Sequence, residues 1–145
     1  MKSAIRTDKA PQPAAAYAQA VASGDLIFVS GQVATNPATG TIDAVTIEDQ
    51  VTQVLSNIEA IILAAGGSKQ SIVRCGVFLA DLADFAAMNR AYKEFFGDSL
   101  PARTTVQAGL GTLRVEIDAI AVRGKSRGRK SRSSARRKEK TQKRS

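Results

Sequence analysis

The segment from Thr46 to Gly67 constrains the fold more than any other part of the chain. Its apolar residues recur at helical spacing and form one broad face, made of Ile47, Val51, Val54, Leu55, Ile58, Ile61, Ile62 and Ala65. Thr46 is placed to cap this helix, and Asp49 stands where a capping-box acid would. Gly66 and Gly67 accept left-handed backbone angles and end it. A helix with a single apolar face needs a second layer to pack on, which favours a sheet.

Strand patterns lie on both sides of this helix. Residues 17–22 and 26–29 are short apolar runs joined by Ser23-Gly24-Asp25, which predicts a hairpin. The first sixteen residues, with two prolines, are expected to be an extended lead-in. Beyond this helix we expect a strand at 72–80 and a second helix at about 82–96. Two more strands are expected at 104–108 and 113–123. The residues predicted to face inward from the second helix are Phe85, Met88, Tyr92, Phe95 and Phe96.

The predicted order is β-β-α-β-α-β-β, an α+β chain. No G-x-G-x-x-G or P-loop follows a strand, so a nucleotide fold is not indicated. The simplest architecture is one sheet with two helices on one face, because each helix has one apolar stripe to bury. The central strands look apolar on both faces. We therefore expect self-association to cover the second face.

The composition changes at Gly124. Residues 1–123 have a net charge of −2, whereas residues 124–145 have a net charge of +10 and no Leu, Ile, Val or aromatic residue. We expect one globular domain over 1–123 and a disordered basic tail over 124–145. The tail's cations attract phosphates, which predicts weak RNA contact. A solubilising extension is the alternative, because no aromatic residue is present to stack on bases.

The residue types that the chain lacks exclude several classes of chemistry. The chain has no histidine and one cysteine, so metal binding has little support and no metal is expected. Cys75 lies in an apolar run and is expected to be a buried, inert thiol, which suits a reducing compartment. No apolar run reaches 18 residues, and the first residues lack the features of a secretory signal. We therefore expect a cytoplasmic protein without membrane contact.

Arg103 and Glu116 form the most informative pair of charged residues. Arg103 follows Pro101 and Ala102 at the start of one predicted strand, and Glu116 interrupts the next. A guanidinium binds a carboxylate through two parallel hydrogen bonds, and a carboxylate beside it can move a proton. This pair is among the few catalytic arrangements that the composition allows. An ordinary salt bridge between strands is the alternative interpretation.

Several short stretches along residues 1–123 occur in the same order as in a known protein family. They are Tyr17-Ala-Gln-Ala, Phe28-Val-Ser-Gly-Gln, Asn36-Pro-Ala-Thr-Gly, Val77-Phe-Leu-Ala-Asp, Pro101-Ala-Arg and Val115-Glu-Ile. Taken in this order, with nearly no gaps, they resemble the Rid family of YjgF-type reactive intermediate deaminases. No single stretch is distinctive, but their colinearity is.

The resemblance implies a chorismate-mutase-like α+β fold assembled as a homotrimer. The sheets of its subunits would face a central barrel, and three active sites would lie in clefts between subunits. It also implies hydrolysis of 2-imino acids such as 2-iminobutanoate and 2-iminopropanoate, and of their enamine tautomers, to 2-oxo acids and ammonia. An imine is already activated toward water, so no cofactor is expected. The alternative is an RNA-directed member of the family, a weak endoribonuclease or translation inhibitor, which the basic tail favours.

The resemblance also assigns roles to individual residues. Arg103 matches the family's arginine for the substrate carboxylate, and Glu116 matches the acid that handles water or the imine nitrogen. Residues that match the cleft lining are Tyr17, Ser30, Gly31 and Asn89, for which packing or structural hydrogen bonding is the alternative role. Thr105 stands where the family's deaminases often have cysteine, and its backbone can still hold a water or an imine. The loop over 109–112 lacks a Leu-Pro common in the family, which bears on substrate range.

Overall fold

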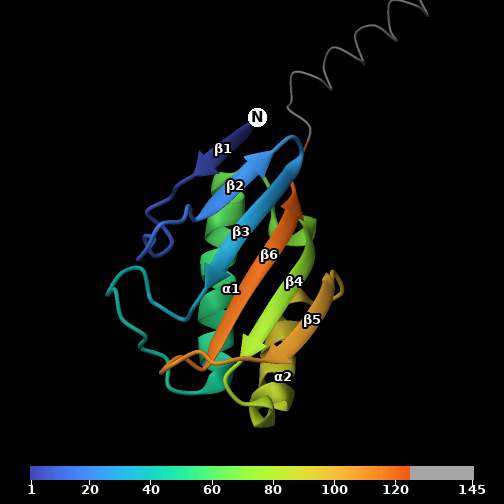
Figure 1. The fold of residues 1–145 in the computed structure, drawn as a ribbon. Helices are drawn as coiled ribbons and strands as arrows, with labels where there is room; N and C mark the ends of the chain where they lie inside the picture. The colour runs from blue at the N-terminus through green and yellow to red at the C-terminus, as the bar shows by residue number, and fades with distance from the viewer. Residues whose placement is uncertain (125–145) are drawn as a thin grey trace, which may run out of the picture.

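The computed structural model describes residues 1–124 as a six-stranded mixed sheet with two helices on one face (Figure 1). The strands and helices are β1 Lys2–Ile5, β2 Ala20–Ser23, β3 Leu26–Gln32, α1 Ile47–Ala64, β4 Ile72–Leu79, α2 Phe85–Phe96, β5 Ala102–Gln107 and β6 Val115–Val122. The predicted disordered tail lies, from residue 125 onward, outside the described residues. An α+β chain with one sheet and two helices is therefore confirmed.

The strand order across the sheet is β1-β2-β3-β6-β4-β5. All neighbouring pairs are antiparallel except β4 and β5, which run parallel. The predicted hairpin of β2 and β3 is confirmed, with Ser23 opposite Leu26 and a positive φ at Gly24. The β5 strand, which carries Arg103, is an edge strand, and β6, which carries Glu116, lies in the middle of the sheet.

The core lies between the sheet and the two helices. The predicted apolar face of α1 is buried, with Val51, Leu55 and Ile58 fully inaccessible. The Thr46 side chain accepts a hydrogen bond from the backbone N–H of Asp49, as the capping pattern predicted. The helix stops before Gly66, whose φ of +90° is one that residues with a side chain rarely adopt.

Three predictions about the elements were wrong. The lead-in contains β1, which was missed because three of its four residues are exposed and it carries no apolar alternation. The element order therefore begins with three strands. The second helix starts at Phe85 after a short 3-10 turn over Leu82–Asp84. Phe85 does not face the core, because it lies in the first helical turn and is 40 % exposed.

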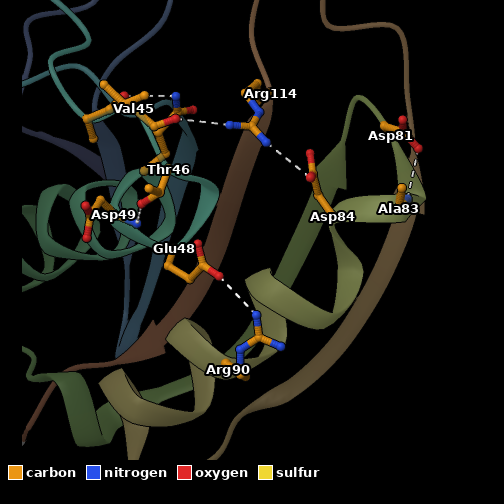
Figure 2. Close-up of polar contacts among 11 residues, drawn as sticks. Val45, Thr46, Glu48, Asp49, Asp81, Ala83, Asp84, Arg90 and Arg114 are labelled. Atoms are coloured by element: carbon orange, nitrogen blue, oxygen red, sulfur yellow. Dashed lines mark hydrogen bonds and ion pairs between the residues drawn. The ribbon is translucent and has the colours of Figure 1, made fainter.

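Polar contacts hold the starts of α1, α2 and β6 together (Figure 2). The Arg114 guanidinium, just before β6, donates to the Val45 carbonyl oxygen at 3.1 Å and to the Asp84 carboxylate at 3.1 Å. Arg90 of α2 pairs with Glu48 of α1 at 3.1 Å. This second pair is largely exposed and contributes little. The Arg114 contacts fix the chain next to Glu116, which makes them the more relevant to the site.

The sheet face away from the helices has no covering layer within residues 1–124. Its exposed apolar side chains include Leu26 and Phe28 of β3 and Val122 of β6. The expectation that the central strands are apolar on both faces was only partly right. On this open face β6 also presents Glu116 and Asp118. None of the helices in residues 1–124 is long and apolar enough to cross a membrane.

Candidate active site

Arg103 lies on the helix side of the sheet. It stands opposite the buried Cys75 in the pairing of β4 with β5, so both side chains point toward α2. The centre of its guanidinium is 4.7 Å from the ring of Tyr92 and 5.5 Å from the ring of Phe85. Its Nη1 atom is 3.9 Å from the sulfur of Met88. Within residues 1–124 the guanidinium has no ion-pair partner and no oxygen acceptor, so its forked N–H donors are available.

Thr105 and Asn89 lie on the strand and the helix that surround this arginine. Thr105 follows Arg103 by two residues and faces the same side, and its hydroxyl is buried without a hydrogen-bond partner among the described residues. Asn89 is half-buried on α2, four residues after Phe85 and three before Tyr92, so the three side chains share one helix stripe. We call Asn89, Arg103 and Thr105 the arginine half of the site.

The thiol beneath the arginine is chemically quiet. Cys75 is fully buried, as predicted, and burial raises its pKa to about 11. Burial, followed by the neighbouring Cys75, also raises the pKa of Tyr92 well above its ordinary value. Both groups are therefore neutral near pH 7. They act as an apolar floor and wall for the guanidinium rather than as reactive groups.

Glu116 lies on the open face of the sheet, packed against the backbone of β3. A Cβ atom placed on Gly31 would come within 2.9 Å of the Glu116 Cδ and 3.0 Å of its Oε2. A side chain at this position would therefore require the Glu116 carboxylate to shift. Glu116 is half-buried, and it lies where β3 and β6 lose register between Val29 and Gln32. The irregularity turns Gly31 toward the acid.

Tyr17 and Ser30 lie on the same side of the molecule as Glu116. Tyr17 is 46 % exposed and, with Gly31, lines a cavity of about 540 Å³ between the N-terminal loop and the loop after β3. The Ser30 hydroxyl donates to the Ala18 carbonyl oxygen at 2.7 Å, so its proton has a structural role and only its lone pairs remain available. We call Tyr17, Ser30, Gly31 and Glu116 the glutamate half.

The two halves do not meet within one copy of the chain. Residues that pair across neighbouring strands form a row of the sheet. Arg103 is in the row of Cys75 and Ala119, whereas Glu116 is in the row of Phe78, which follows Cys75 by three residues on β4. These rows present opposite faces, and the two residues are two strands and three rows apart, which is about 14 Å. The alternative interpretation of an Arg103–Glu116 salt bridge is therefore wrong for the single chain.

Several residues that shape the site were missed from the sequence. Phe85 and Tyr92, seven residues apart on α2, flank the guanidinium. Their helical spacing had indicated only a role in the core. Gln19 and Asn57, each 1 % exposed, hold the two loops around the cavity by hydrogen bonds to backbone atoms. An isolated polar residue beside an apolar run is the signal that could have found them. Within residues 1–124, no group of three or more His, Cys, Asp or Glu side chains is arranged to hold a metal ion.

Comparison with known proteins identifies the family. A family model described as "Endoribonuclease L-PSP" matches residues 7–123. The chain belongs to the YjgF/RutC/Rid family. A RutC family protein of Pyrococcus horikoshii is 44 % identical over 123 residues, which are 83 % of this chain and 98 % of that protein. Reactive Intermediate Deaminase A, chloroplastic, of Arabidopsis thaliana is 38 % identical over 122 residues, covering 83 % of this chain and 65 % of that protein.

Solved structures of Rid relatives have the same fold. The crystal structure of Escherichia coli TdcF with bound serine matches with a TM-score of 0.79 and 40 % identity, covering 84 % of this chain and 99 % of that one. The resemblance deduced from the sequence is thereby confirmed. Names within the family include both deaminases and endoribonucleases, so family membership alone leaves the reaction open.

Proposed function

We propose that this protein hydrolyses 2-imino acids, including 2-iminobutanoate and 2-iminopropanoate, to 2-oxo acids and ammonia. The observation that carries the proposal is the Arg103 guanidinium, which is framed by two aromatic rings and has no acidic partner within residues 1–124. Each charge-assisted hydrogen bond from this fork to a substrate carboxylate contributes about 1.5–3 kcal/mol before desolvation. The serine bound to E. coli TdcF is itself a small molecule with a carboxylate, which supports this choice of ligand.

The proposed reaction uses Glu116 as the acid–base group. Glu116 takes a proton from a water molecule as the water oxygen bonds to the electrophilic C=N carbon. The proton passes to the nitrogen, giving a carbinolamine. Collapse of that intermediate breaks the C–N bond, releases ammonia and leaves the 2-oxo acid, with one water consumed for each imine. Arg103 contributes orientation, because fixing the carboxylate fixes the reacting carbon.

A complete site needs a second copy of the chain. Because the arginine half and the glutamate half lie on opposite faces of one sheet, we propose that each site combines the arginine half of one subunit with the glutamate half of its neighbour. We further propose a homotrimer in which the open sheet faces surround a central barrel. The exposed apolar side chains of Leu26, Phe28 and Val122 support burial of that face. Sedimentation velocity tests the assembly, and a monomer at micromolar concentration would contradict it.

The direct test is ammonia release from a freshly generated imino acid. An amino acid oxidase or a dehydratase supplies the imine, and hydrolysis is followed with and without the protein. Arg103→Ala is expected to abolish the acceleration while the fold is kept. Arg90→Ala is the matched control, because Arg90 is an exposed arginine on the far side of α2. Full activity of folded Arg103→Ala would contradict the proposal.

An RNA-directed function is the second candidate, and one observation favours it. The match to the family model ends at residue 123, and the 22 residues that follow carry a net charge of +10. Such a segment is expected to bind phosphates with a steep dependence on salt. RNA binding of the full chain, compared with residues 1–123 between 50 and 200 mM salt, tests this role. Equal binding by both would exclude the tail as the cause.

A further inference from the structure

The cavity beside Gly31 lies next to the carboxylate that the proposed reaction uses. Its volume is about 540 Å³, and it lies between the N-terminal loop and the segment that follows β3. Gly31 lines the cavity and also contacts the Glu116 side chain. Glu116 itself does not line the cavity, and Gly31 is the residue that joins the two. The volume falls in the range of pockets that hold ligands much larger than a four-carbon acid.

The first wall of the cavity is held by Gln19. Its Oε1 atom accepts from the Thr7 backbone N–H at 2.8 Å, and its Nε2 atom donates to the Thr7 carbonyl oxygen at 3.0 Å. The same Nε2 atom donates to the Pro11 carbonyl oxygen at 2.9 Å. Gln19 is 1 % exposed, so these bonds are shielded from water. The part of the N-terminal loop from Thr7 to Pro11 is thereby fixed to the sheet.

The second wall is held by Asn57 of α1. Its Nδ2 atom donates to the carbonyl oxygens of Val33 at 3.2 Å and Thr35 at 2.8 Å, and its Oδ1 atom accepts from Gln53 at 2.9 Å. Asn57 is also 1 % exposed. Because both walls are fixed by buried amides, the cavity is preformed and a ligand does not have to order these loops.

The chemistry of the walls selects the ligand group. Pro11, Tyr17, Val33 and Pro37 line the cavity, together with the uncharged polar side chains of Gln12, Gln32 and Thr35. Asp8 also lines it, and its carboxylate repels a second negative charge. An apolar, uncharged side chain fits these walls, whereas a side chain that ends in a carboxylate does not.

We infer that this cavity is a subsite for the substrate side chain, and that it favours 2-imino acids with apolar side chains longer than that of 2-iminobutanoate. The inference rests on the proposed function, because it takes Glu116 as the reacting end. Each methylene buried in such a subsite contributes about 0.8 kcal/mol, which corresponds to about a fourfold gain in kcat/KM. The gain continues along an unbranched chain until the cavity is filled.

The test is a series of imino acids made from alanine, 2-aminobutanoate, norvaline and norleucine, with glutamate as the acidic comparison. We expect kcat/KM to rise about fourfold per methylene across the series and to be lowest for the imine of glutamate. Gln19→Met, which keeps the volume but removes the hydrogen bonds, is expected to reduce the gain to less than about twofold. Gln50→Met is the matched control, because Gln50 is a buried amide that binds the Ala44 carbonyl oxygen, outside the cavity.

Two outcomes overturn the inference while the proposed function stands. One is a kcat/KM that is flat or falls beyond 2-iminobutanoate, and the other is an equal loss of the chain-length gain in both glutamine variants. If no imino acid is hydrolysed, the proposed function fails. The subsite is then tested by itself, by measuring the binding of 2-oxobutanoate and 2-oxohexanoate by calorimetry. Tighter binding of the longer acid then supports it, and equal binding of the two overturns it.

Discussion

A methyl group added at Gly31 would test the role of Glu116 without changing any ionisable group. The backbone of Gly31 does not have a positive φ, so alanine meets no backbone strain there. Its Cβ would lie 2.9 Å from the Glu116 Cδ, whereas carbon atoms in contact are about 3.5–4.0 Å apart. The carboxylate must therefore move by about 0.6–1 Å. A displacement of that size can lower a reaction rate by about 100-fold.

We expect Gly31→Ala to lower kcat for imine hydrolysis between about 10-fold and 100-fold, with a smaller change in KM. The free energy of unfolding is expected to fall by about 1 kcal/mol at most, because only the end of the half-buried Glu116 side chain has to move. Gly67→Ala is the matched control, because its Cβ would meet Ile62 Cγ2 at 2.8 Å and Ile27 Cδ1 at 3.0 Å in the core, away from Glu116. It is expected to lose stability but to keep its kcat.

The measurement combines ammonia release at saturating imine with urea unfolding of both variants. A wild-type kcat in folded Gly31→Ala would refute the reasoning, because the acid could then move without affecting turnover. An equal fall of kcat in Gly67→Ala would refute it as well, since the loss would follow from stability alone.

Three further predictions concern the arginine half and its surroundings. Arg103→Lys keeps the charge but loses the paired fork, so kcat/KM is expected to fall about 10-fold to 150-fold, and wild-type kinetics would argue against two-point binding. Thr105→Val removes a buried hydroxyl that has no partner within residues 1–124. Urea unfolding is therefore expected to show an equal or slightly greater free energy of unfolding. A decrease of more than about 2 kcal/mol would mean that the hydroxyl is hydrogen-bonded. Burial raises the pKa of Cys75 from 9.0 to about 11, so the unfolded chain loses this proton first and stability is expected to fall as pH rises from 9 to 11. Cys75→Ala is expected to have a smaller slope over that pH window, and an unchanged slope would contradict the assignment.

Local elements were the most predictable part of the fold. Helix α1 follows from its 3.6-residue periodicity, its Thr46 cap and its terminal glycines, all of which are properties of neighbouring residues. The β2–β3 hairpin follows in the same way from its turn. By contrast, β1 forms only because it pairs with the edge of β2, with Lys2 opposite Ser23. Its own sequence has no apolar alternation to reveal it.

The sequence by itself limited the chemistry that the proposed site can use. The absence of histidine and the presence of Arg103 and Glu116 are facts of composition and position. Only the tertiary structure decided that these two residues lie on opposite faces of the sheet, one beneath the rings of α2 and the other against Gly31. The reason is that strand order and register place side chains across the sheet, and no local pattern encodes them. The walls held by Gln19 and Asn57 depend on the same long-range placement, because each amide binds backbone atoms 8 to 24 residues away.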